Sequence, residues 1–153
     1  MKAYWLDQPD QAPIAAEELT AQGLFNQHCA PEGDAAQPLL DDLKARRGYV
    51  HQDEVALRPD TPGLDELLDK FSPEHHHDED EVRFVLDGAG IFDVRSLDDR
   101  WMRIEVGPGD MLVVPALRHH RFFLQDSRTI RCIRLFQDPS GWVAHYRNEE
   151  GAA

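Results

Sequence analysis

The chain has 153 residues, a length that suits one folded domain with a single core. It carries 16 Lys and Arg against 29 Asp and Glu, which gives a formal net charge of -13. Nucleic-acid binding depends on clustered basic residues, whereas the basic residues here are scattered. The balance of charge therefore argues against a nucleic-acid partner.

Cysteine content and hydropathy place the chain in a reducing, aqueous compartment. Cys29 and Cys132 are too few for a disulfide framework and neither belongs to a Cys-x-x-Cys pair, so we expect two reduced thiols, with Cys132 buried in a strand. The N-terminal residues become polar before a secretory apolar segment could form, and no later run reaches bilayer-spanning length. We therefore expect a cytoplasmic protein with no membrane partner.

Residues 1–70 predict short strands and helices that pack on a later barrel. Strands are expected over 2–6 and 24–28, and helices over 15–22, 39–47 and 62–71. Gly23 and Gly48 are placed to end the first two helices. Thr61 is the predicted N-cap of the third, with Pro62 in its first turn. Residues 30–38 form a loop by their Pro and Gly content, and whether this loop moves as a lid is left open.

The second half of the chain has the texture of an all-β barrel or sandwich, with short apolar or alternating runs broken by turn residues. The expected strands cover 81–86, 91–95, 102–106, 111–114, 121–124, 130–136 and 142–146. Asp87-Gly88 predicts a hairpin, and Gly107-Pro-Gly-Asp110 predicts another tight turn. We expect one domain over 1–153, with the barrel over 71–146 and a frayed polar tail over 147–153.

Three consecutive histidines precede the first strand of this barrel. In an extended chain, side chains two residues apart share a face, so His75 and His77 point one way and His76 points the other. A further histidine, His119 or His120, follows the apolar run Met-Leu-Val-Val-Pro. A histidine run can also lie on a solvated surface, and the acidic residues that follow would ordinarily face water.

The strand after the histidines carries a carboxylate and a guanidinium on one face. Glu81 and Arg83 alternate with the apolar Val82 and Phe84. Three imidazoles and one carboxylate would leave two neighbouring positions open on a six-coordinate metal, whereas structural zinc sites close at four ligands. An all-oxygen set would favour calcium or magnesium, while zinc remains compatible with this donor set.

The spacing of these residues resembles the two motifs of the cupin superfamily. The first is His-x-His-x-x-x-Glu beginning at His75, and the second is Gly-x5-Pro-x4-His ending at His120. The resemblance implies a mainly β fold, a double-stranded β-helix or jelly-roll barrel with a few short helices that are mostly N-terminal. It selects His120 over His119 and implies one metal with four ligands, His75, His77, Glu81 and His120. Two departures are a missing glycine before the first motif and Leu117 in place of a glycine after the proline.

Within that superfamily the chain is similar to the acireductone dioxygenase family of the methionine salvage pathway, over roughly residues 71–146. The similarity lies in five motifs: Glu74-His-x-His-x-Glu-Asp-Glu-Val-Arg-Phe84, Gly88-x-Gly-x-Phe92, Val114-Pro-Ala116, His120-x-Phe122 and Arg134-Leu-Phe-x-Asp-Pro-x-Gly-Trp142. The N-terminal half matches only in its coarse order of elements.

The family resemblance implies an activity and a cofactor. The metal would be one Fe(II) or Ni(II) per chain, and the substrates would be 1,2-dihydroxy-3-keto-5-methylthiopentene and O2. The iron form would give 2-keto-4-methylthiobutyrate and formate. The nickel form would give 3-methylthiopropionate, formate and carbon monoxide. The protein would act as a monomer.

Four further residues receive substrate-binding roles from this resemblance. Arg83 would pair with the anionic enediolate, or would only neutralise Glu81 or Asp87. Phe71, Phe122 and Trp142 would line the substrate cavity, or would pack in the core as aromatics on strands usually do.

Two other functions are also compatible with the sequence. One rival is a different cupin metalloenzyme, such as a sugar isomerase or another dioxygenase. The other is a non-enzymatic cupin module that binds small molecules, which zinc-only protein without oxygen uptake would favour. Asp78, Glu79 and Asp80 form either a solvated turn or a group that orients imidazole N–H donors. We leave the other histidines as structural or surface residues, namely His28, His51 and His145.

Overall fold

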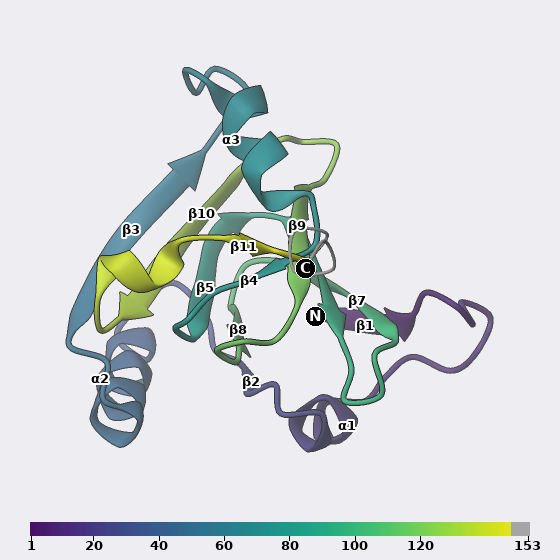
Figure 1. Ribbon diagram of the computed structural model, residues 1–153. Coiled ribbons are helices and arrows are strands. Elements are labelled where there is room, and N and C mark those ends of the chain that lie inside the picture. Colours follow the sequence, from purple (N-terminus) through teal and green to yellow (C-terminus); the bar gives the residue numbers. More distant parts are fainter. Residues whose placement is uncertain (148–153) are drawn as a thin grey trace.

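The computed structural model describes residues 1–147 and consists of two antiparallel sheets that face each other (Figure 1). The six-stranded sheet contains, in spatial order, β1 (Lys2–Trp5), β7 (Trp101–Val106), β6 (Gly90–Arg95), β9 (His120–Leu124), β4 (His75–His76) and β11 (His145–Tyr146). The five-stranded sheet contains β2 (Asn26–His28), β8 (Asp110–Val114), β5 (Glu81–Gly88), β10 (Ile130–Phe136) and β3 (His51–Leu57). The predicted frayed tail lies outside the described residues except for Arg147.

Side-chain alternation along β5 explains how the two sheets pack. Val85 packs in a hydrophobic cluster between the two sheets, together with Phe92 and Met102 of the opposite sheet. Val82 and Phe84 point to the other side, where the leucines of the second helix cover the sheet. The predicted alternation is therefore confirmed. Burying one large apolar side chain stabilises the folded state by about 1.5 to 3 kcal/mol relative to leaving that side chain exposed.

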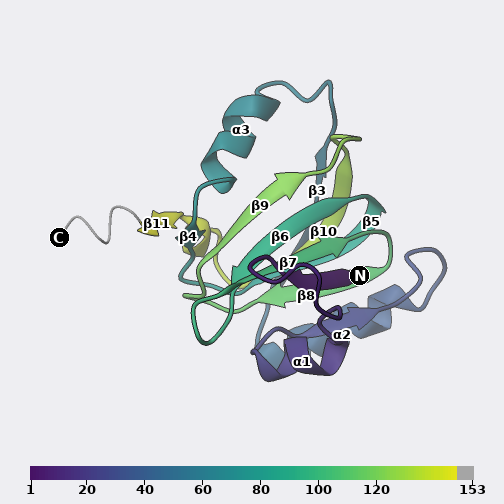
Figure 2. The ribbon, with the colours of Figure 1, turned by 90° about the vertical axis from the view of Figure 1, so that its right-hand side faces the viewer.

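The described part of the chain also contains three α-helices and one 3-10 turn: α1 (Ala16–Ala21), α2 (Ala36–Arg47), α3 (Leu64–Phe71) and η1 (Pro139–Trp142). Figure 2 shows α1 and α2 together below the sheets, with α3 on the opposite side near β9. Gly48 ends α2 in the left-handed conformation, as predicted. Within residues 1–147, no helix combines the length and the apolar character needed to cross a membrane.

The N-cap of α3 differs from the prediction. The hydroxyl of Thr61 accepts a hydrogen bond from the backbone N–H of Arg58 at 2.8 Å, so it does not cap the helix. Gly63 occupies the cap position with a left-handed backbone, and the helix starts at Leu64. Pro62 consequently lies in the turn before the helix. The predicted loop over 30–38 is also shorter, because α2 begins at Ala36.

Two predictions about the strands were wrong and two strands were missed. Asp87-Gly88 does not form a hairpin, because β5 pairs with β8 and β10 whereas β6 pairs with β7 and β9. The turn therefore carries the chain from one sheet to the other. Trp142 ends η1, and only the last two residues of the predicted 142–146 strand form β11. The missed strands are β3, at the edge of the five-stranded sheet, and the two-residue β4, between β9 and β11. The turn before Asp110 forms as predicted, closed by a bond from its N–H to the carbonyl of Gly107 at 3.0 Å.

Candidate metal centre

Three histidines from two neighbouring strands meet inside the barrel. β4 pairs with β9 so that His75 lies directly opposite His120, and His77 follows β4 on the same face as His75. All three side chains are buried. One ring nitrogen of each lies within 4.8 Å of the corresponding nitrogens of the other two. The structure thus brings together the three histidines that the sequence motifs single out, and it places His119 elsewhere.

Main-chain carbonyls fix the orientation of these rings. The Nδ1 atoms approach carbonyl oxygens at 2.7 Å (His75 to Pro73), 3.2 Å (His77 to Val143) and 2.9 Å (His120 to Arg118). A carbonyl can only accept, so each Nδ1 must carry the proton. The neutral ring then presents an unprotonated Nε2, which is the atom that can bind a metal.

Burial keeps two of these rings neutral. Removal from water, with the nearby His120 ring acting in the same direction, lowers the pKa of His75 to about 4. Burial also lowers the pKa of His77, although the carboxylate of Glu81 partly opposes this shift. Neutral imidazole is the form that binds a metal, so these rings are prepared for coordination at neutral pH.

Glu81 brings a carboxylate to the same point from β5. Its Oε2 lies 3.2 Å from His120 Nε2, and its Oε1 lies 3.8 Å from His77 Nε2. Burial raises the pKa of Glu81, but the guanidinium of Arg83, whose Nη2 lies 3.1 Å from Oε1, acts in the opposite direction, and the pKa lies below its usual range. Glu81 is therefore ionised.

The facing atoms of Glu81 and His120 indicate that a cation belongs between them. Among the described residues, neither Glu81 Oε2 nor His120 Nε2 has a hydrogen-bond partner, and both atoms are buried. With the His120 proton on Nδ1, both atoms present lone pairs. Two buried acceptors that face each other are unfavourable unless a positive charge binds both. Three imidazoles and a carboxylate are donors that suit a first-row divalent ion.

A cavity of about 150 Å³ opens beside this cluster. Its polar end is formed by His75, Glu81, Arg83 and His120, and its walls include Phe71 and Phe122. The structure therefore places both of these aromatic rings on the cavity wall. Sequence reasoning missed Val55 and Leu57 of β3, which also line it. In the sequence, Val55 and Leu57 alternate with Glu54 and Ala56, and this alternation could have indicated a strand with Val55 and Leu57 on its inner face.

Arg83 faces the cavity while holding Glu81. Its Nη2 bonds to Glu81 Oε1 at 3.1 Å and its Nη1 bonds to the carbonyl of Val82 at 2.9 Å. A guanidinium has five N–H donors, so donors remain for a ligand. Trp142 does not line the cavity. Its ring lies against Phe136, with centroids 4.4 Å apart, and under the guanidinium of Arg134 at 4.3 Å.

The acidic residues after the histidines anchor neighbouring loops. Asp80 accepts hydrogen bonds from the Tyr49 hydroxyl at 2.7 Å and from the Ala116 N–H at 2.8 Å. Glu79 accepts from the backbone N–H groups of Gln137 and Asp138. None of these four hydrogen bonds involves an imidazole, so Asp80 and Glu79 bind the main chain and a tyrosine hydroxyl here and do not orient histidine rings through them.

Comparison with known proteins places the chain in a family. A model of the ARD/ARD′ family matches residues 8–144. The chain belongs to this family. The acireductone dioxygenase of Dictyostelium discoideum is 40% identical over 143 residues, covering 94% of this chain and 97% of that protein. The acireductone dioxygenase of Bacillus velezensis is 46% identical over 110 residues, which is 72% of this chain and 62% of the relative.

A solved structure of the same family shares the fold. It is an acireductone dioxygenase from Bacillus anthracis with a cadmium ion in its active centre. The TM-score is 0.83 at 32% sequence identity, and the match covers 95% of this chain and 97% of the other. The mainly β cupin fold predicted for this ARD-family chain is therefore confirmed.

Proposed function

We propose that this protein is a metal-dependent dioxygenase that cleaves 1,2-dihydroxy-3-keto-5-methylthiopentene with O2 in methionine salvage. The observation that carries the proposal is a carboxylate and three inward-facing imidazoles beside a mostly apolar cavity, with an arginine at its polar end. The similarity to acireductone dioxygenases over nearly the whole chain supports the same reaction.

The proposed cofactor is one Fe(II) or Ni(II) per chain. It would be held by His75, His77 and His120 through Nε2 and by Glu81 through a carboxylate oxygen. When bound, such an ion would supply the electronic coupling between an electron-rich enediolate and O2. The iron form is expected to give 2-keto-4-methylthiobutyrate and formate, and the nickel form 3-methylthiopropionate, formate and carbon monoxide.

The chain's own residues would bind and orient the substrate. Arg83 offers N–H donors to the anionic oxygens, and its proximity to Glu81 keeps it in place. Phe71, Phe122 and the β3 side chain Leu57 form apolar wall, which suits the methylthio end of the substrate. Excluding water from this wall strengthens the charge interactions at the polar end.

Metal reconstitution tests the proposal. The protein is reconstituted anaerobically with Fe(II) or Ni(II), and oxygen uptake is then measured on a synthetic acireductone. We expect uptake with both metals and a different product set for each. If the purified protein contains only zinc, and neither the Fe(II) nor the Ni(II) form consumes oxygen, the binding-module alternative is favoured. Oxygen uptake on a different enediol alone would favour a different cupin enzyme.

Single substitutions test the ligand set. His75→Ala, His77→Ala and His120→Ala are each expected to lose the interior metal and the activity. His119→Ala is the matched control for His120→Ala, because its ring lies outside the interior group. An equal loss in His119→Ala would contradict the assignment.

The oligomeric state and cellular location complete the proposal. We propose a monomer that acts in the cytoplasm. Light scattering coupled to size exclusion checks the first point, because a mass of twice the 17.5 kDa chain would contradict it.

A further inference from the structure

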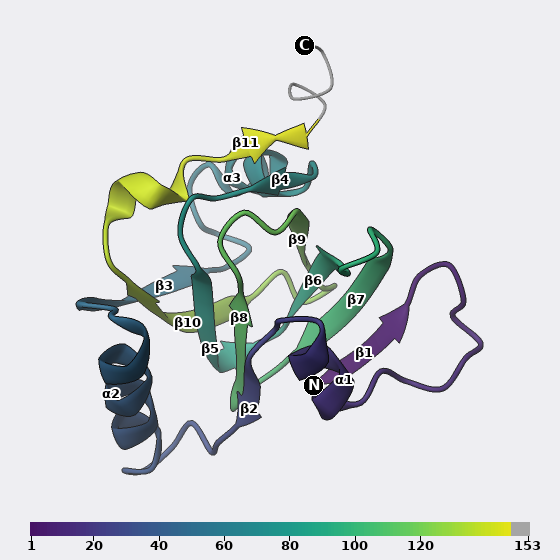
Figure 3. The ribbon, with the colours of Figure 1, turned by 60° about the horizontal axis from the view of Figure 1, so that its bottom comes forward.

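A second group of histidines lies on the outer face of the strands that carry the interior site. β11 pairs with β4 so that His145 is directly opposite His76. Figure 3 shows β11 running alongside β4 at the edge of the molecule. Directly opposed residues share a face of the sheet, and the ring centroids of His76 and His145 are 5.0 Å apart.

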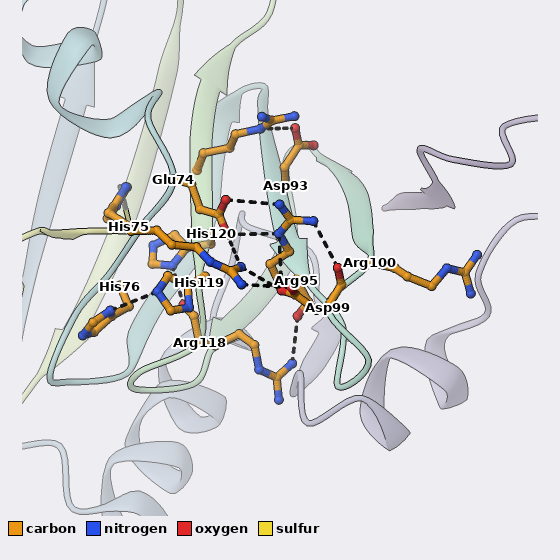
Figure 4. Close-up of polar contacts among 12 residues, drawn as sticks. Glu74, His75, His76, Asp93, Arg95, Asp99, Arg100, Arg118, His119 and His120 are labelled. Carbon is orange, nitrogen blue, oxygen red and sulfur yellow. Dashed lines mark hydrogen bonds and ion pairs between the residues drawn. The ribbon is translucent and has the colours of Figure 1, made fainter. Parts of the chain in front are cut away.

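The neighbouring histidine and carboxylate complete this outer group. His145 Nε2 lies 3.2 Å from Asp78 Oδ2. One donor atom from each of His76, Asp78 and His145 lies within 4.8 Å of the other two. On the other side of His76, His119 Nε2 lies 3.4 Å from its Nδ1, the contact drawn as a dashed line in Figure 4. His119 therefore limits the rotation of the His76 ring.

We propose that His76, Asp78 and His145 form a second metal site, which binds one imidazole-preferring divalent ion such as Zn²⁺. Two imidazoles and one carboxylate are the donors of well-known three-ligand zinc sites, in which solvent occupies the remaining position. Side-chain exposures of 41% for His145 and 62% for Asp78 leave that position open to solvent. None of these three residues belongs to the interior histidine group.

An ion at this outer site would fasten the C-terminal segment to the barrel. Among residues 1–147, β11 is held to β4 by two residue pairs, His145 with His76 and Tyr146 with His75. The same segment supplies the Val143 carbonyl that orients His77. A metal that joins His145 to His76 and Asp78 would add a cross-link between β11 and the segment of β4, and would stabilise the folded chain by mass action.

Metal counting tests this proposal. Protein loaded with Ni(II) is passed over a chelating resin and dialysed against micromolar free Zn²⁺, and nickel and zinc are counted separately by atomic emission. We expect one nickel and one zinc per chain. His145→Ala and Asp78→Asn should keep the nickel and lose the zinc. His51→Ala removes an exposed histidine of β3 and should keep both. No zinc in the wild type, or an unchanged zinc count in His145→Ala, would overturn the proposal.

Thermal melting distinguishes loss of the zinc site from misfolding of the variants. Micromolar Zn²⁺ should raise the melting temperature of the nickel-loaded wild type and of His51→Ala. His145→Gln, which keeps a polar side chain of similar length, should melt cooperatively without this rise. An equal rise in His145→Gln would overturn the proposal. The metal count and the melting temperature do not depend on turnover. Both would therefore still test the outer site if the dioxygenase assignment failed.

Discussion

Replacement of Arg83 by methionine separates substrate binding from metal binding. Methionine keeps an unbranched apolar stem and removes the guanidinium that bonds to Glu81 Oε1 at 3.1 Å. The Arg83 side chain is only 16% exposed, so solvent screens its charge weakly. A hydrogen bond to a charged group contributes about 1.5 to 3 kcal/mol. Loss of one such bond to the substrate should therefore lower kcat/KM by about 10- to 150-fold.

The metal should remain in Arg83→Met. Glu81 would lose its guanidinium partner, but a bound cation would still neutralise its buried carboxylate. The assay is oxygen uptake on the synthetic acireductone by the reconstituted variant, together with its metal content by atomic emission. Arg131→Met is the matched control, because Arg131 lies on β10, is 38% exposed and pairs with Glu54 at 3.2 Å. It should retain wild-type kinetics.

Two results would refute this reasoning. Unchanged kcat/KM in Arg83→Met would mean that the guanidinium does not contact the substrate. Loss of metal together with activity would mean that Arg83 acts by holding Glu81 in place. The expected result, retained metal with poor turnover, is distinct from both.

Three further predictions concern the core, the thiols and the metal. Phe84→Ala should lower the free energy of unfolding by about 3 to 5 kcal/mol in urea titrations, because the ring is fully buried, and a loss below about 1 kcal/mol would contradict its packing. Burial raises the pKa of Cys132 to about 11, so at pH 8 the thiol should stay unlabelled in the native protein while the half-buried Cys29 reacts, and equal labelling rates would contradict this. Chelation should lower the melting temperature and added Ni(II) should restore it, because removal of the cation leaves two buried acceptors facing each other, Glu81 Oε2 and His120 Nε2; a melting temperature unaffected by chelation would contradict this.

The barrel strands and the inward direction of the histidines could be predicted because both depend on local alternation. His75 and His77 differ by two positions, and strand geometry alone places them on one face. Glu81 and Arg83 follow the same rule on β5. The pairing of His75 with His120 is a long-range contact; the residue pattern offered His119 or His120, and the resemblance to the cupin motifs selected His120.

Features that depend on tertiary pairing could not be predicted from local pattern. Asp87-Gly88 has the composition of a hairpin turn, yet the partners of β5 and β6 lie in separate sheets, so the turn serves as a crossover. β3 is an edge strand with polar residues on its exposed side, and the sequence His-Gln-Asp-Glu-Val-Ala-Leu gives a weak apolar signal. Its pairing with β10 stabilises it and brings Val55 to the cavity.

The carbonyl of Val143 affects the order in which the centre can mature. All four proposed ligands lie between residues 75 and 120, and a ribosome would have synthesised them well before residue 143 emerges. His77 has no fixed tautomer until that carbonyl accepts its Nδ1 proton. A nascent or truncated chain that ends before Val143 would therefore contain every ligand and still hold one of them incorrectly.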